Sequence, residues 1–182
     1  APSAQPLDDL GLTPQQYLLF VGRLLPHKGA HRLVRAYAWA TQEYPGLFDG
    51  IPLVIVGGSA WTDAYVTEVK QLIRETPGVV YLGERPGAVL KALQAHALAH
   101  VFPTSEEGLS LAVLEAATSG NMVVATDIVA NKEALGDSGV YVPVQDEKAL
   151  GKALAGVLSL PSEERASYAA AQKAYVMDRF DP

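Results

Sequence analysis

The sequence predicts an α/β fold in which helices cover both faces of a parallel sheet of about six strands. Short apolar runs alternate with longer segments whose apolar residues recur at helical spacing. Most of these runs are apolar throughout, as is typical of strands buried on both faces. The loops after the first four runs all contain glycine. Because strand–helix–strand repeats form right-handed crossovers, the pattern indicates a doubly wound, Rossmann-like sheet.

Each element is expected where the apolar pattern changes its period. The expected strands cover 17–21, 52–56, 79–82, 98–102, 122–126 and 139–143. Helical spacing between them predicts helices over 30–38, 63–74, 87–97 and 110–118. A helical tail runs from residue 146 to about 177 and breaks at Leu160 and Pro161, since proline can begin a new helix.

Length and composition indicate one globular domain. The chain has 182 residues, of which 49% are hydrophobic and 19% charged. Residues 1–16 are rich in Pro, Ser and Gln and do not begin with Met, so we expect a linker from a missing N-terminal domain. The domain itself is expected from residue 17 to residue 177.

Charge and residue usage exclude several classes. A net charge of −6 argues against electrostatic binding of nucleic acid over a large surface, so any anion must be bound by a local group of cations. The absence of cysteine excludes disulfides, thiolate metal sites and a cysteine nucleophile, and is compatible with the cytosol. No apolar run reaches the roughly 18 residues needed to span a bilayer, and the first residues do not form a signal peptide.

The post-strand loops indicate a phosphate site. In a doubly wound sheet the ligand binds at the carboxyl ends of the strands, near the switch in strand order. The first of these loops carries Gly22, Arg23, Lys28 and Gly29 and opens a helix. Glycine allows close backbone approach and a helix start offers free N–H groups, while the two cations could neutralise a diphosphate. The alternative is that both are solvated loop charges, since neither G-x-G-x-x-G nor a P-loop is present.

The stretch "EEGLSLAVLE" adds two acids seven residues apart. If Gly108 begins the helix, Glu107 lies near its cap and Glu115 about two turns inside, so the two acids could contact different parts of one extended ligand. Acids near a helix N-terminus also stabilise its dipole, which is the alternative for Glu107. Apolar neighbours predict that Glu115 is buried and needs partners, which ribose hydroxyls would supply.

Three motifs in order carry a family resemblance over 17–177. "YLLFVGRLLPHKGAHRLVRAYA", "LVIVGG" and the run from "EEGLSLAVLE" to "DEKALGKAL" resemble the C-terminal half of retaining GT-B glycosyltransferases of family four, with their E-x7-E signature. The chain departs from the usual E-G-F-G at Leu109 and Ser110, which leaves the sugar open. In "IVANKEAL" only Glu133 of the family pattern is kept, so that loop is assigned no role.

The resemblance implies a nucleotide-sugar donor site. Arg23 and Lys28 would hold the diphosphate, and Glu107, the catalytic residue, would contact sugar hydroxyls near the reacting carbon. Glu115 would bind the ribose. The remaining substrate-binding positions implied are the glycine of the first loop, the backbone N–H groups after Glu107 and a loop beside the base: Gly22, Gly108, Leu109, Ser110, Leu111, Gly83, Glu84 and Arg85.

The function implied is transfer of a sugar, with retention, from a UDP- or GDP-sugar to a glycan or lipid-linked acceptor. No D-x-D is present, so metal-independent binding without a resident cofactor is expected. The acceptor would bind through the missing N-terminal domain, toward which 178–182 begins to cross. The isolated chain is therefore expected to bind donor but to transfer little. A cytoplasmic location is expected, with peripheral contact of the full-length enzyme at the inner membrane face.

Other readings remain open at this point. A GT-B relative that epimerises nucleotide-sugars or phosphorylyses sugars is one, and a non-catalytic nucleotide-binding module is another. Glycoside hydrolysis needs carboxyls flanking the scissile bond and fits the strand-end context less well. Two histidine pairs at a spacing of four lack a third metal ligand nearby: His27 with His31, and His96 with His100. Trp39 is expected in the core or as an edge anchor, and the resemblance implies that the loop of Trp61 lies near the donor crevice.

Overall fold

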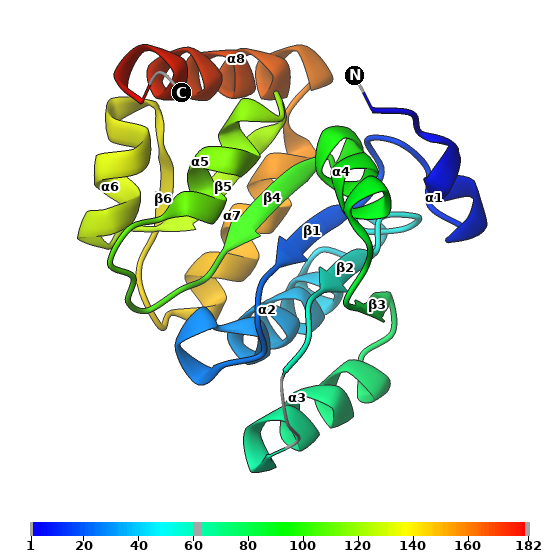
Figure 1. The fold of residues 1–182 in the computed structure, drawn as a ribbon. Coiled ribbons are helices and arrows are strands. Elements are labelled where there is room, and N and C mark those ends of the chain that lie inside the picture. The colour runs from blue at the N-terminus through cyan, green and yellow to red at the C-terminus, as the bar shows by residue number, and fades with distance from the viewer. Residues whose placement is uncertain (1, 60–62, 181–182) are drawn as a thin grey trace.

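A parallel six-stranded sheet forms the centre of the molecule (Figure 1). The computed structural model describes residues 2–59 and 63–180. The strand order is β3-β2-β1-β4-β5-β6, and every neighbouring pair is parallel. The strands are β1 (Leu18–Val21), β2 (Leu53–Val56), β3 (Val79–Gly83), β4 (Ala99–Phe102), β5 (Met122–Thr126) and β6 (Val140–Val142). The predicted doubly wound α/β fold is confirmed, and the order reverses between β1 and β4.

Helices connect successive strands and complete the chain. They are α1 (Gln5–Asp9), α2 (Ala30–Glu43), α3 (Ala64–Glu75), α4 (Gly87–His96), α5 (Leu111–Thr118), α6 (Val129–Leu135), α7 (Glu147–Ser159) and α8 (Ser162–Arg179). Two short 3-10 turns, η1 (Pro26–Lys28) and η2 (Gly136–Ser138), precede α2 and follow α6. The predicted break of the helical tail at Leu160 and Pro161 is confirmed, because α7 ends at Ser159 and α8 begins at Ser162.

The helices bury the sheet on both faces. On one face α2, α3 and α7 pack over strand residues such as Phe20 and Ile55. On the other face the core divides: α1 and α4 cover β1 and β2, and α5, α6 and α8 cover β4 and β5. The division falls between β1 and β4, where the strand order reverses. This is the position at which a doubly wound sheet leaves room for a ligand.

Two helices were not expected from the sequence. The segment predicted as a linker contains α1, whose Leu7 is fully buried against the core beside α4. Between β5 and β6 lies α6, where Ala134 and Leu135 pack into the core. Both helices have seven residues or fewer and no side-chain cap at the N-terminus, so neither gives a strong periodic signal.

A membrane-spanning helix is not found among the residues that the structure describes, because none of their helices combines sufficient length with sufficient hydropathy.

Candidate functional site

A cavity of about 380 Å³ opens at the carboxyl ends of β1 and β4. Its walls come from the end of β1 and the following loop, from β4 and its loop, from the first turn of α5 and from α6. The lining residues are Phe20, Val21, Gly22, Arg23, Lys28, Phe102, Thr104, Glu107, Leu109, Ser110, Leu111, Ala112, Val113 and Asn131. The cavity therefore lies where the strand order reverses, as predicted for the ligand site.

Two glycines allow the site loops to touch each other. Gly29, at the N-cap of α2, has φ +82°, and a Cβ there would collide with the carbonyl oxygen of Pro103 after β4. Gly57, with φ +140°, lies against the carbonyl oxygen of Gly22 in the same way. The loops after β1, β2 and β4 thus pack backbone against backbone. A side chain at either glycine would separate them.

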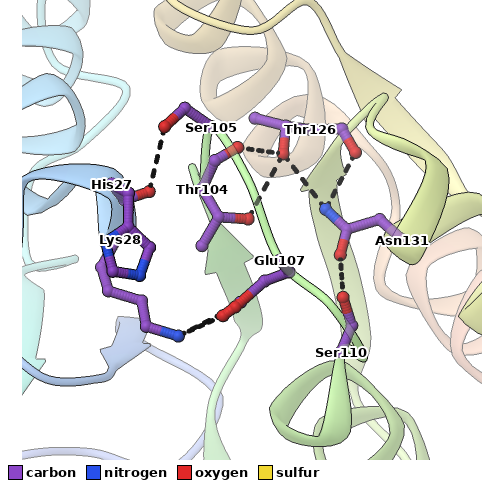
Figure 2. A network of polar contacts seen from close by, with 8 residues as sticks. All are labelled: His27, Lys28, Thr104, Ser105, Glu107, Ser110, Thr126 and Asn131. Carbon is purple, nitrogen blue, oxygen red and sulfur yellow. Dashed lines mark hydrogen bonds and ion pairs between the residues drawn. The ribbon is translucent and has the colours of Figure 1, made fainter.

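The two cavity charges of opposite sign are paired. Lys28 Nζ donates to both carboxylate oxygens of Glu107, with 3.0 Å to Oε2 (Figure 2). The side chains are 27% and 16% exposed, so the pair is only partly solvated. The Ser105 N–H donates to the His27 carbonyl oxygen at 2.9 Å, which ties the two loops together beside the pair. Arg23 also lines the cavity, and it makes no ion pair with any residue in the described part of the chain.

A buried chain of hydrogen bonds forms one wall of the cavity. The Ser110 hydroxyl donates to Asn131 Oδ1 at 2.7 Å, and Asn131 Nδ2 donates to the Thr126 carbonyl oxygen at 2.9 Å and to its Oγ1 at 3.1 Å (Figure 2). Thr126 Oγ1 donates to the Thr104 carbonyl oxygen at 2.6 Å. All four residues are buried. The network joins the ends of β4 and β5 to the start of α5 and to α6.

The first turn of α5 presents open backbone donors at the cavity. Ser110 occupies the N-cap position, and its side chain makes no capping hydrogen bond. The amide N–H groups of Ala112 and Val113, both lining residues, make no hydrogen bond to any residue the structure describes. Free N–H groups at a helix start favour an anion, and Lys28 and Arg23 stand across the same cavity. The arrangement is that of an anion site next to a carboxylate.

Most sequence-predicted site residues come together in this cavity. They are Gly22, Arg23, Lys28, Glu107, Leu109, Ser110 and Leu111. Gly108 lies beside it in a shallower hollow that also includes His27 and Glu106. Glu84, Arg85 and Glu115 are exposed and do not line the cavity. The Glu84 side chain lies against Gly58, where an added Cβ would stand 3.1 Å from Glu84 Cγ.

One expectation about the acids was wrong, and one condition is not met. The helix begins at Leu111, one residue after the predicted start at 110, and not at Gly108, so Glu107 lies outside it and pairs with Lys28 instead of capping. Glu115 is exposed and not buried. The apolar residues around it in sequence do not surround it in space, because Val113, Ala116 and Ala117 turn one face of α5 to the core and Glu115 lies on the other.

Two polar lining residues were missed, Thr104 and Asn131. The segment "IVANKEAL" was assigned no role, yet Asn131 is fully buried and hydrogen-bonded on both sides of its amide. A signal was present in the sequence: Asn131 stands between Ala130 and Ala134, the apolar residues of a short helical turn. An amide on such a face must find internal partners, which points to a polar neighbour.

His31 and His100 each contact a side chain outside their own pair. Nδ1 of His31 lies 2.7 Å from the Tyr65 hydroxyl, and burial is the largest cause that lowers the pKa of His31. His100 is fully buried with Nε2 3.1 Å from Ser119 Oγ, and burial lowers its pKa to about 4. Within 2–59 and 63–180, no group of three His, Cys, Asp or Glu side chains suits a metal ion.

Of the two tryptophans, the structure describes Trp39. Trp39 packs against the core beside Tyr44, as predicted, and its ring lies close to Gly151 of α7. Trp61 lies outside the described residues.

The chain is similar to known proteins in sequence and in structure. A family model described as "Glycosyl transferases group 1" matches residues 15–159. The O-antigen chain mannosyltransferase B of Escherichia coli is 29% identical over 75% of this chain and 35% of its own length. A D-inositol 3-phosphate glycosyltransferase of Corynebacterium urealyticum is 33% identical over 77% of this chain and 34% of its own. The chain thus spans about a third of the length of these curated relatives.

Solved structures agree on the fold. Anabaena Alr3699/HepE, crystallised in complex with UDP and glucose, superposes with a TM-score of 0.83 at 24% identity, over 100% of this chain and 49% of that chain. A UDP-forming trehalose-phosphate synthase from Burkholderia xenovorans gives 0.81 at 19% identity, over 95% of this chain and 43% of that chain. These matches confirm the expected fold, that of the GT-B glycosyltransferases. Because the family model matches residues 15–159, which is most of the chain, the chain belongs to the glycosyl transferases group 1 family.

Proposed function

We propose that this chain is the nucleotide-sugar donor-binding domain of a retaining glycosyltransferase. One observation carries the proposal: a lysine–carboxylate pair and an uncapped helix start share one cavity at the carboxyl ends of β1 and β4. Such a cavity combines donors for a diphosphate with an acceptor for sugar hydroxyls. The names of the relatives, a mannosyltransferase and an inositol-phosphate glycosyltransferase, support the same class of donor.

The diphosphate would bind between the β1 loop and α5. Its oxygens would accept from Lys28 Nζ, from the Arg23 guanidinium and from the open N–H groups of Ala112 and Val113. When the sugar–phosphate bond breaks, negative charge develops on the leaving diphosphate. The same donors would stabilise that charge without having to reorganise, and this is their contribution to the rate.

Donor binding would exchange the partners of Lys28 and Glu107. In the structure the two charges neutralise each other, at 27% and 16% side-chain exposure. A diphosphate oxygen would take over Lys28, and the released carboxylate of Glu107 would accept from sugar hydroxyls near the reacting carbon. A nucleoside diphosphate without sugar leaves Glu107 with no new partner. A nucleotide-sugar supplies partners to both charges and should therefore bind better than the diphosphate alone.

The nucleoside would extend beyond the cavity. Glu115 stands one helical turn after Leu111, which lines the cavity, so both residues lie on one side of α5. We assign the ribose to Glu115. The loop of Glu84 and Arg85 follows β3 on the far side of β2, and we assign it to the base. Both segments are exposed, which leaves them open to a ligand.

We place the acceptor on a second domain. The chain covers about a third of its curated relatives, so these relatives carry further residues that this chain does not match. Glycans and lipid-linked acceptors are the proposed class. The isolated chain should bind donor and transfer little. Donor binding should also be metal-independent, because basic side chains and backbone donors neutralise the diphosphate.

The test is calorimetric titration of the chain with UDP, GDP, ADP and their sugars, with and without EDTA. We expect selective binding to one base, tighter binding of the nucleotide-sugar than of the diphosphate, and no effect of EDTA. Absence of binding to every nucleotide would refute the donor-domain assignment. Loss of binding in EDTA would refute metal independence and leave the donor assignment standing.

A further inference from the structure

Asn131 lines the cavity and is fully buried in α6. Among the residues that the structure describes, its side chain hydrogen-bonds only to uncharged groups. Its neighbours are Ser110 at the start of α5 and Thr126 at the end of β5 (Figure 2). We propose that Asn131 is a positioning residue that withholds Ser110 from capping α5 and so keeps the Ala112 and Val113 N–H groups open for the diphosphate. The inference rests on the proposed function.

The orientation of the Asn131 amide follows from its partners. A backbone carbonyl only accepts, so the side-chain nitrogen must face the Thr126 carbonyl oxygen, at 2.9 Å. Oδ1 then faces Ser110 and can only accept, so Ser110 must donate its single hydroxyl hydrogen to it, at 2.7 Å. The Thr126 hydroxyl is committed in turn to the Thr104 carbonyl oxygen at 2.6 Å. Each of these donor hydrogens is therefore used once, the two on Asn131 Nδ2 going to the carbonyl oxygen and to Oγ1 of Thr126, and the direction is fixed.

The Ser110 oxygen keeps its lone pairs for accepting, so the bond to Asn131 prevents the cap through the position in which it holds that oxygen. Serine at an N-cap normally accepts from the N–H of the second or third helical residue, here Ala112 or Val113. In this structure no side-chain cap is made, and both N–H groups stay without a partner among the described residues. Aspartates at the N-caps of α3 and α7 do cap, accepting from Val66 and Ala149 at 2.9 Å. The helix that faces the cavity, α5, differs from α3 and α7 because it has no side-chain cap.

The hydroxyl of Ser110 also has a restricted role toward a ligand. Its only hydrogen is given to Asn131, so toward the cavity it offers no donor to a phosphate oxygen. Removing the hydroxyl should therefore cost the diphosphate little. Removing Asn131 should cost more, because the freed hydroxyl can rotate and cap Val113, competing with the phosphate for the same N–H.

The test is a double-mutant cycle with Asn131→Ala, Ser110→Ala and the double variant, titrated with the nucleoside diphosphate that binds and with its free nucleoside. We expect Asn131→Ala to weaken diphosphate binding roughly tenfold, the size of one hydrogen bond to a charged group. Nucleoside binding should not change. Ser110→Ala removes the hydroxyl and keeps the backbone N–H that the resemblance assigns to the ligand, so it should weaken diphosphate binding by no more than about threefold. The double variant should recover to within about twofold to threefold of the unmodified chain, because no hydroxyl remains to cap the helix.

A matched control separates positioning from general loosening. Gln172 is also a fully buried amide anchored on β5, where it accepts from the Val123 N–H and donates to the Val123 carbonyl oxygen, both at 2.8 Å. It does not line the cavity. Gln172→Ala should lower stability as Asn131→Ala does, without changing diphosphate affinity. Equal weakening by Gln172→Ala, or a double variant as weak as Asn131→Ala alone, would overturn the proposal.

A second readout needs no ligand. Native-state hydrogen exchange of the Val113 amide should slow roughly tenfold in Asn131→Ala relative to Ala117 in the same helix, and return to its original rate in the double variant. Unchanged Val113 exchange in Asn131→Ala would overturn the inference. If the unmodified chain binds no nucleoside diphosphate, the proposed function fails, and this exchange measurement alone still decides whether Asn131 withholds the cap.

Discussion

The polar side chains at the amino end of the sheet and the charged pair at its carboxyl end differ in how fully their hydrogen-bonding groups are partnered. Near the amino end of β4, Asn121 Nδ2 donates to the Ala95 carbonyl oxygen at 2.7 Å, and its Oδ1 accepts from Gln15 at 2.9 Å. His100 stands next to this group with Ser119 as its partner, and it is 2% exposed. At the carboxyl end, Lys28 and Glu107 pair with no further charged side chain in the part of the chain that the structure describes, and they lie beside open helix N–H groups and a cavity.

The difference separates polar groups that stabilise the fold from polar groups that are available to a ligand. At the amino end the polar groups complete one another, so removing one leaves a buried partner unsatisfied and lowers stability. At the carboxyl end the strongest groups face open space, and their partners must change before they can act on a ligand. Substitutions in the charged pair should therefore change mainly binding, and substitutions among the amino-end groups should change mainly stability.

The largest separation is expected for Lys28→Ala. Nucleoside diphosphate affinity should fall about 100-fold, since a hydrogen bond to a charged group contributes up to about 3 kcal/mol. The free energy of unfolding should change by less than about 1 kcal/mol, because the lost pair is partly solvated. Calorimetry and urea unfolding measure the two quantities. The exposed Lys91 on α4 supplies the control, and Lys91→Ala should change neither.

The next effect belongs to the amino end and appears with pH. Burial lowers the pKa of His100 to about 4, below its unfolded value of about 6.5. Between these values the unfolded chain binds one proton more than the folded chain, so stability falls as pH falls through this window. The loss between pH 7 and pH 5 should be about 2 kcal/mol. In His100→Leu this part of the pH dependence should vanish, with diphosphate affinity unchanged; an identical slope in both proteins would contradict the assignment.

The smallest effect is expected for Glu115→Ala. The residue is exposed on α5 outside the cavity, so stability should stay within about 0.5 kcal/mol of the unmodified chain. Binding of the nucleotide should weaken roughly fivefold to tenfold if its ribose meets this carboxylate, and binding of inorganic pyrophosphate should not change. Weakening of pyrophosphate to the same extent would place Glu115 at the phosphates and break the proposed division of the site.

The sequence predicted the frame of the fold well because the signal was hydrophobic. Strands buried on both faces are apolar throughout, as in β2 and β5, and they were placed within a residue or two. Topology then brought Lys28 and Glu107 together from 79 positions apart, since both follow strands that lie side by side at the reversal of strand order. Short helices such as α1 and α6 were not predicted, because a few residues do not define a helical period.

The remaining errors concern the direction in which side chains point and the segments that they meet. Glu115 was expected to be buried because its sequence neighbours are apolar, but one helix turns some side chains inward and others outward. Asn131 was overlooked because its partners, Ser110 and the end of β5, come from other segments of the chain. Hydrogen-bond partners that are distant in sequence follow only from the packed structure.

The most direct test of a site that exchanges partners is titration of Glu107→Gln with both the nucleoside diphosphate and the nucleotide-sugar. The uncharged amide no longer holds Lys28 as an ion pair, so the diphosphate should bind several-fold tighter than it does to the unmodified chain. The gain in affinity that the sugar contributes in the unmodified chain should disappear. Weaker binding of both ligands by the same factor, or unchanged binding of both, would contradict the account.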